Sequence, residues 1–185
     1  MATPQPLSFI SEDEYLTGEP ASSVRHEYVN GQVYAMAGAS DKHNLIAVNA
    51  SSLFNTQLPD HCEVFMADMK VRIQTQKDLM FYYPDVMVCC TENDRATYYR
   101  EQPCLIIEVL SPSTERQDRF EKFWSYQQIP TLQEYLLLNQ NFQEATLFRR
   151  SNSWRPEVYR EETLHLESVG LDIALDTLYR RVRFG

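Results

Sequence analysis

The sequence predicts a mixed α/β (α+β) fold, in which a mixed β-sheet is flanked by helices. The chain has 185 residues, of which 43% are hydrophobic, and this is enough to pack the core of one domain. Short apolar runs typical of strands are interspersed with segments of helical periodicity. Their order is helix, hairpin, helix, several strands, helix, strands, which differs from a regular βαβ alternation. We find no linker or internal repeat, and we expect a single domain over residues 1–185.

The N-terminal region begins with a short predicted helix. Ser11 and Glu14 stand in the spacing of a capping box, which predicts a helix from Glu12 to about Leu16. Gly18 and Pro20 are expected to end it.

A hairpin is predicted next, because Asn30-Gly31 lies between two β-rich arms. Side chains alternate between the two faces of a strand, so Glu27 is expected on the face opposite to His26 and Tyr28.

The second helix is predicted from a cap at Ser40 or Asp41 to about Leu58. His43 lies near its N-terminus. Its apolar stripe is formed, at helical spacing, by Ile46, Ala50, Leu53 and Phe54.

The middle of the chain is rich in β-forming residues. Residues 62–75 are predicted to form one bent strand or two, and residues 80–90 one more. Residues 104–110 are a continuous apolar run, typical of a strand that is buried on both faces.

A helix is predicted over residues 114–128, with Ser113 or Thr114 as its cap and Pro130 after its end. We assign one of its faces to packing and expect the other to turn toward the preceding strands. The packing face holds Phe120, Phe123, Trp124 and Gln127, and the other holds Arg119, Lys122 and Tyr126.

The C-terminal part is predicted to be mostly β-structure. We expect a strand at residues 132–139 and an antiparallel pair at residues 144–151 and 154–161. Residues 169–182 are expected to form a short strand followed by a terminal helix.

The charge narrows the range of functions. The chain has 17 basic and 26 acidic residues, a net charge of -9, which argues against tight nonspecific DNA binding. It does not exclude phosphodiester chemistry, because a divalent cation can supply the positive charge. No apolar run is long enough to span a bilayer, and the N-terminus lacks the pattern of a secretory signal. We therefore expect a cytoplasmic location and no membrane association.

The four cysteines are Cys62, Cys89, Cys90 and Cys104. They form no C-x-x-C pair, and adjacent Cys89 and Cys90 would point to opposite faces of a strand. We expect buried free thiols and no zinc site.

Three charged residues on consecutive elements indicate a functional site. Asp85 follows Pro84 at the start of an apolar stretch, and Lys122 lies on the predicted helix. Glu108 lies within an apolar strand, where a charge is costly unless it is paired or metal-bound.

Structural alternatives remain open for each candidate. Asp85 could cap a turn, Glu108 could form an ion pair with Lys122 or Arg119, and Lys122 could be solvated. In the same way Tyr126 could serve packing alone.

The segments YPDVMVCC, CLIIEVLSPST and RFEKFWSYQQIP, preceded by RHEYVNGQVYAMAG, resemble the Uma-two family of restriction-endonuclease-like proteins. That family is assigned to the PD-(D/E)XK nuclease superfamily. The resemblance extends from about Val24 to Asn139. It implies a restriction-endonuclease-like core, a divalent metal and phosphodiester hydrolysis.

The resemblance also implies roles for individual residues. Asp85 and Glu108 match the two acidic positions and would bind Mg²⁺, with Mn²⁺ as an alternative ion. The backbone carbonyl of Val109 is the expected third ligand. The superfamily's lysine position, two residues after Glu108, is occupied by Leu110.

In this family the lysine lies on the following helix, which Lys122 and Tyr126 match as K-x-x-x-Y. Glu27 matches an acidic residue of the N-terminal hairpin, with an exposed hairpin face as its alternative. His43 matches less closely and is kept as an active-site neighbour or a structural residue. We assign no role to Asp68.

The function expected from this resemblance is that of a metal-dependent DNA endonuclease. Lys122 would orient or deprotonate the attacking water, or stabilise the pentavalent phosphorus, and cleavage would leave a 5′-phosphate. The alternatives are a catalytically inactive nuclease fold that serves as a nucleic-acid or protein interaction module, and a protein whose pocket holds a structural cation only. We expect a homodimer.

Overall fold

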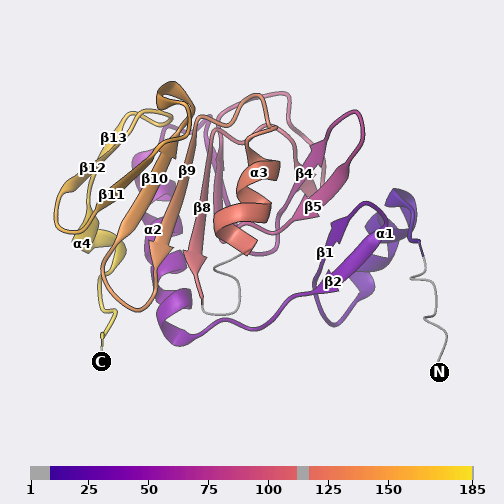
Figure 1. Cartoon of the computed structure of the whole chain (residues 1–185), viewed down its shortest axis with the longest axis horizontal. Coiled ribbons are helices and arrows are strands. Elements are labelled where there is room, and N and C mark those ends of the chain that lie inside the picture. The colour runs from indigo at the N-terminus through magenta and orange to yellow at the C-terminus, as the bar shows by residue number, and fades with distance from the viewer. Residues whose placement is uncertain (1–8, 112–116, 185) are drawn as a thin grey trace.

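The computed structural model describes residues 9–111 and 117–184, without the side chains of residues 117–119. The described residues form two larger β-sheets and one separate hairpin, with helices packed on the sheets (Figure 1). The expected class, mixed sheets with flanking helices, is confirmed.

The central sheet has six strands, in the order β11-β10-β9-β8-β6-β3. Only β8 and β9 run parallel within it, and the other pairs are antiparallel. Its strands are β3 (Glu63–Met66), β6 (Val86–Cys89), β8 (Leu105–Leu110), β9 (Glu134–Asn139), β10 (Ala145–Arg149) and β11 (Pro156–Tyr159).

The second sheet has five strands, in the order β2-β1-β5-β4-β7. Its strands are β1 (His26–Val29), β2 (Gln32–Ala35), β4 (Lys70–Gln74), β5 (Leu79–Tyr82) and β7 (Tyr99–Arg100). The predicted hairpin is β1–β2, and its turn residues Asn30 and Gly31 both have positive φ, as a type I′ turn requires.

The helices lie on different sides of the central sheet. The long helix α2 (Asp41–Gln57) and α4 (Leu175–Leu178) pack on one face, together with the hairpin β12 (Thr163–Leu166) and β13 (Leu171–Ala174). The other face meets β4, β5 and α3 (Phe123–Tyr126), which continues a π-helical turn at Gln117–Lys122. Figure 1 shows α3 in front of the sheet and α2 behind it.

Short helical segments lie at the start of the described chain and after β10. Helix α1 (Glu12–Gly18) begins with the predicted capping box of Ser11 and Glu14 and leads into a 3₁₀ turn at Glu19–Ala21. Another 3₁₀ turn covers Arg150–Asn152. None of the helices within the described residues is long and apolar enough to cross a membrane.

One strand prediction is wrong in a way that matters for the site. Residues 80–90 were expected to form one strand, but they form β5 and β6, which belong to different sheets. Pro84 lies between them, and proline cannot donate the hydrogen bond that a central strand requires. The chain therefore crosses from one sheet to the other directly before Asp85. Of the one or two strands predicted for residues 62–75, the structure has two, β3 and β4, and they too lie in different sheets.

The face assignment on the third helix is also wrong in part. Phe120 and Trp124 were expected to pack, but they are 60% and 67% exposed. Phe123 packs as expected, and Tyr126, which was assigned to the other face, packs with it against Tyr135. The predicted cap at Ser113 or Thr114 lies outside the described residues, as does the side chain of Arg119.

The expectation of four free thiols is wrong for two of them. Cys62 and Cys90 form a disulfide with a Cα–Cα distance of 4.0 Å. They directly flank β3 and β6, in which Glu63 pairs with Cys89, so strand pairing brings them together across 28 residues. Sequence spacing alone does not reveal such a cross-strand neighbour. Cys89 and Cys104 are free and buried.

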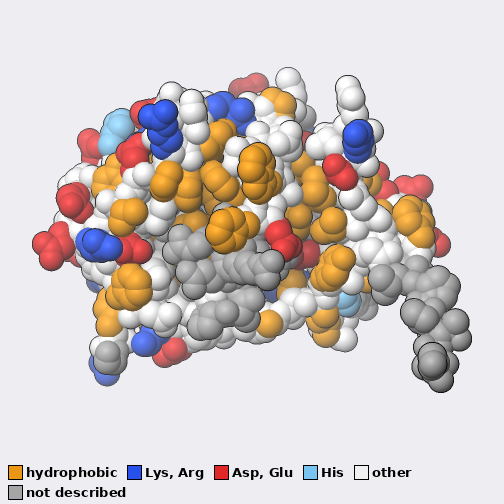
Figure 2. Space-filling view, viewed as in Figure 1, with side chains coloured by type: hydrophobic (Ala, Val, Ile, Leu, Met, Phe, Trp, Pro, Cys, Tyr) orange, Lys and Arg blue, Asp and Glu red, His pale blue; other side chains and the backbone are white. Residues whose placement is uncertain are grey.

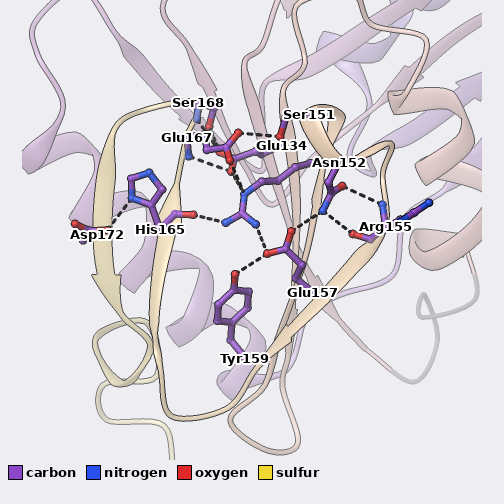
Figure 3. A network of polar contacts seen from close by, with 11 residues as sticks. Glu134, Ser151, Asn152, Arg155, Glu157, Tyr159, His165, Glu167, Ser168 and Asp172 are labelled. Carbon is purple, nitrogen blue, oxygen red and sulfur yellow. Dashed lines mark hydrogen bonds and ion pairs between the residues drawn. The ribbon is translucent and has the colours of Figure 1, made fainter.

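A buried ion-pair network connects the C-terminal hairpin, β12–β13, to the central sheet (Figure 3). The Glu134 carboxylate accepts hydrogen bonds from Arg149 Nε at 3.0 Å and from the backbone N–H groups of Glu167 and Ser168. Arg149 also bonds Glu157 and the carbonyl oxygen of His165. Glu134 is 0% exposed, so its charge depends on these donors.

The thiol chemistry of the protein tests the disulfide. Ellman titration of non-reduced protein in denaturant should find two thiols, and a count of four would contradict the Cys62–Cys90 bond. In the native state at pH 8, Cys104 should react slowly, because burial raises its pKa to about 11 and suppresses the thiolate.

Removing Arg149 should destabilise the protein strongly. Arg149→Met leaves the buried Glu134 carboxylate without its cation, and we expect a loss of about 3 kcal/mol in the free energy of unfolding measured with urea. The matched control is Arg160→Met. That side chain is 70% exposed in its pair with Glu144, and its loss should cost less than about 1 kcal/mol. Equal effects of the two substitutions would contradict this view of the network.

Candidate active site

A cavity of about 840 Å³ opens where the N-terminal hairpin, the start of α2, β6, β8 and α3 meet. The polar and charged residues that line it include Arg25, Glu27, His43, Asp85, Glu108, Ser111 and Lys122. It thus collects candidate residues that are far apart in the sequence.

Asp85 and Glu108 lie side by side on one face of the central sheet. Strands β6 and β8 pair with Val86 opposite Ile107, so Asp85 falls next to Glu108 one step further along. The backbone N–H of Asp85 donates to Glu108 Oε2 at 3.1 Å, and the Val109 N–H donates to Asp85 Oδ2 at 2.7 Å. These backbone bonds fix the two carboxylates relative to each other.

Lys122 joins this pair to the other sheet. Its Nζ lies 2.8 Å from Glu27 Oε1 and 3.4 Å from Glu108 Oε1. Glu27 belongs to β1, so the ammonium group lies between carboxylates from the two sheets. All three side chains are buried, with exposed fractions of 7% or less. A buried charge of this kind is tolerated only when it is paired.

Tyr126 lies one helical turn after Lys122 and holds Glu108 from the same side. Its hydroxyl donates to Glu108 Oε1 at 2.8 Å, and the residue is 0% exposed. Burial, followed by the nearby Glu108 carboxylate, raises the pKa of Tyr126 well above its usual value. The phenol therefore stays protonated and serves as a hydrogen-bond donor.

His43 lies at the other edge of the carboxylate pair. Its Nε2 is 3.1 Å from Asp85 Oδ2. The Ser40 hydroxyl accepts the His43 backbone N–H and thereby places the histidine in the first turn of α2. Sequence analysis left open whether His43 is an active-site neighbour, and in the structure it contacts Asp85.

Tyr82 also contributes to the site, although it was not among the residues expected there. The Lys122 ammonium lies 5.8 Å from the centre of the Tyr82 ring, within the range of a cation–π interaction. Tyr82 lies three residues before Asp85, at the end of β5, and Pro84 is the sequence signal that could have shown that the strand ends there.

Asp68 is not among the residues that line the cavity. Its side chain is 76% exposed and pairs with Arg25 at the surface. We therefore use it as a control residue below.

The donor set fits a hard divalent cation that retains water ligands. Within the described residues, no group of three or more His, Cys, Asp and Glu side chains is placed to hold a metal ion, so the protein's share of the ligands would be small. The carboxylates of Asp85 and Glu108 are accompanied by the carbonyl of Val109. The Val109 N–H donates to the Asp85 carboxylate. Since the N–H and C=O of a strand residue point toward the same side of the strand, the Val109 carbonyl is expected to face the same side as Asp85. Two carboxylates and one carbonyl suit Mg²⁺, which binds few protein oxygens and keeps several waters.

Comparisons with known proteins agree with this architecture. A solved structure described as a "putative nuclease belonging to DUF820", from Anabaena variabilis, matches with a TM-score of 0.71. The match covers 92% of this chain and 97% of that chain at 19% identity, so it shows a shared fold.

Two relatives come from Synechocystis sp. and are named as uncharacterized proteins. The protein slr1290 is 39% identical over 184 residues, which cover 97% of this chain and 96% of the relative. The protein sll1609 is 38% identical over 131 residues, covering 69% and 73% of the two chains.

The family model Uma2, described as "Putative restriction endonuclease", matches residues 12–177. This range includes both sheets and every candidate residue of the site. The chain therefore belongs to the Uma2 family of restriction-endonuclease-like proteins.

Proposed function

We propose that this protein is a metal-dependent DNA endonuclease whose centre is formed by Asp85, Glu108 and Lys122. The observation that carries the proposal is a carboxylate pair linked by backbone hydrogen bonds, with a buried ammonium group 3.4 Å from Glu108. The pair borders a cavity large enough for a nucleotide unit. Titratable groups that converge on one cavity are candidates for a functional site.

Asp85, Glu108 and the Val109 carbonyl are the groups that would bind Mg²⁺ or Mn²⁺. The bound ion would act as a Lewis acid and would lower the pKa of a coordinated water. The protein holds these ligand groups in fixed positions. The Val109 N–H and His43 hold Asp85, and Tyr126 holds Glu108.

Hydrolysis would form a bond between the water oxygen and phosphorus and would break the bond from phosphorus to the 3′ oxygen. The water loses a proton and the 3′ oxygen gains one, which leaves a 5′-phosphate and a 3′-hydroxyl. Glu27 and Glu108 hold Lys122 as a cationic donor. We therefore assign Lys122 to orienting the water or stabilising charge on the phosphoryl oxygens.

The proposal includes a homodimer, because two-fold symmetry is the common arrangement of soluble oligomers and would present two centres to a duplex. Light scattering coupled to size-exclusion chromatography measures the mass directly.

A second candidate function is a nucleic-acid or protein interaction module without catalysis. The net charge of -9 favours the protein-binding form of this function, because such a protein attracts the phosphates of nucleic acid weakly. The ion pair of Lys122 with Glu108 also offsets part of the charge that a cation would meet. Metal binding and cleavage, measured separately, discriminate between the two functions.

Cleavage assays test the catalytic proposal. The purified protein should cut supercoiled plasmid or single-stranded DNA with Mg²⁺ or Mn²⁺, and EDTA should abolish cutting. Asp85→Asn, Glu108→Gln and Lys122→Met should each reduce the rate by at least about 100-fold, because each removes a fixed charge at the reacting centre. Asp68→Asn, which removes an exposed carboxylate, should retain the wild-type rate. Full activity of Lys122→Met would exclude its assigned role.

Thermal unfolding tests the metal site independently of cleavage. Mn²⁺ at about 100 times its Kd should stabilise the wild type by about 2.7 kcal/mol, a rise in Tm of about 5–10 °C. Asp85→Asn should lose this shift and Asp68→Asn should keep it. A shift in wild type without any cleavage would favour the structural-cation or interaction function, and the absence of a shift would contradict the metal site.

A further inference from the structure

A second hollow, of about 460 Å³, lies beside α3 and joins the active-site cavity. Trp124 and Gln128 line one side of it, and Thr75, Gln76 and Lys77 line the other. Asp78, Met80 and Ser125 line both this hollow and the active-site cavity. A linear ligand bound in one of these hollows would therefore extend into the other.

The helix beside this hollow exposes two large aromatic side chains. Phe120 and Trp124 are 60% and 67% exposed and lie four residues apart, whereas Lys122 and Tyr126 on the inner side are buried. Figure 2 shows hydrophobic side chains gathered on the surface over α3. Exposed aromatic residues at the rim of a cavity gain free energy when a flat apolar group covers them.

The net charge of the protein indicates which kind of flat apolar group would cover these aromatic side chains. With 26 acidic and 17 basic residues, the chain attracts a phosphate backbone weakly. A DNA substrate must therefore gain affinity from its bases. Stacking of a base on an aromatic side chain contributes substantially and tolerates any sequence, but only unpaired bases expose their faces.

We infer that the hollow beside α3 binds single-stranded DNA, with one base stacked on Trp124, and that it leads the strand into the active-site cavity. Phe120, four residues earlier, is a further exposed aromatic side chain on this helical segment, and Lys77 is the cation among the residues that line the hollow. This inference rests on the proposed function, because it names the substrate class of that site.

Binding measured without metal keeps this inference separate from catalysis. In EDTA, with Asp85→Asn protein, the fluorescence anisotropy of a labelled 15-nucleotide strand gives the Kd. Trp124→Ala should weaken binding about 10-fold, and Trp124→Phe should recover most of the loss, because stacking needs only an aromatic ring. Phe142→Ala, at another aromatic that is 49% exposed, should have no effect. Duplex of the same sequence should bind at least about 10-fold more weakly.

Three results would overturn the inference: equal affinity for single strand and duplex, unchanged affinity in Trp124→Ala, or conversion of a dimer to a monomer by Trp124→Ala. The last would show that this surface binds a second copy of the chain. The two proposals fail separately. Trp124-dependent binding without cleavage by the wild type would retain the inference and reject the nuclease function. Cleavage that is insensitive to Trp124→Ala would retain the nuclease function and reject the inference.

Discussion

The contact of the Lys122 ammonium with Glu27 and Glu108 is the interaction on which the candidate site depends. Glu27 comes from the five-stranded sheet and Glu108 from the six-stranded sheet, and the lysine reaches both from the helix between β8 and β9. Three charges are buried together, and removing the lysine would leave two carboxylates without a cation, whereas removing one glutamate would leave the lysine paired with the other. The same contact therefore orders the site and stabilises the packing of one sheet beside the other.

This arrangement suits phosphodiester chemistry because its charges are fixed before a substrate arrives. Backbone N–H groups hold the carboxylates of Asp85 and Glu108, and the neutral phenol of Tyr126 adds a donor that burial keeps protonated. Preorganised dipoles and charges need no rearrangement in the transition state, which is the main source of electrostatic catalysis. Fixed local geometry matters more in an acidic protein, because its long-range attraction to phosphate is weak.

Sequence reasoning predicted the features that depend on local patterns. The hairpin turn, the capping box and the buried strand with Glu108 follow from residues close together in the chain, and so does the helical spacing of Lys122 and Tyr126. It did not predict features that depend on which strands pair. The division of residues 80–90 between two sheets, the disulfide and the outward direction of Trp124 all arise from tertiary packing. Periodicity identified two faces of the third helix, but it could not tell which one meets the sheet.

A double-mutant cycle on Lys122 and Glu27 tests whether the lysine joins the two sheets through this ion pair. Urea unfolding of the wild type, Lys122→Met, Glu27→Gln and the double variant gives the coupling free energy between the two side chains. The ion pair at 2.8 Å with both partners buried predicts a coupling of about 1–3 kcal/mol, with the double variant more stable than the sum of the single losses implies. Losses that add to within about 0.5 kcal/mol would show that Lys122 does not join the two sheets, and would contradict this account of the site.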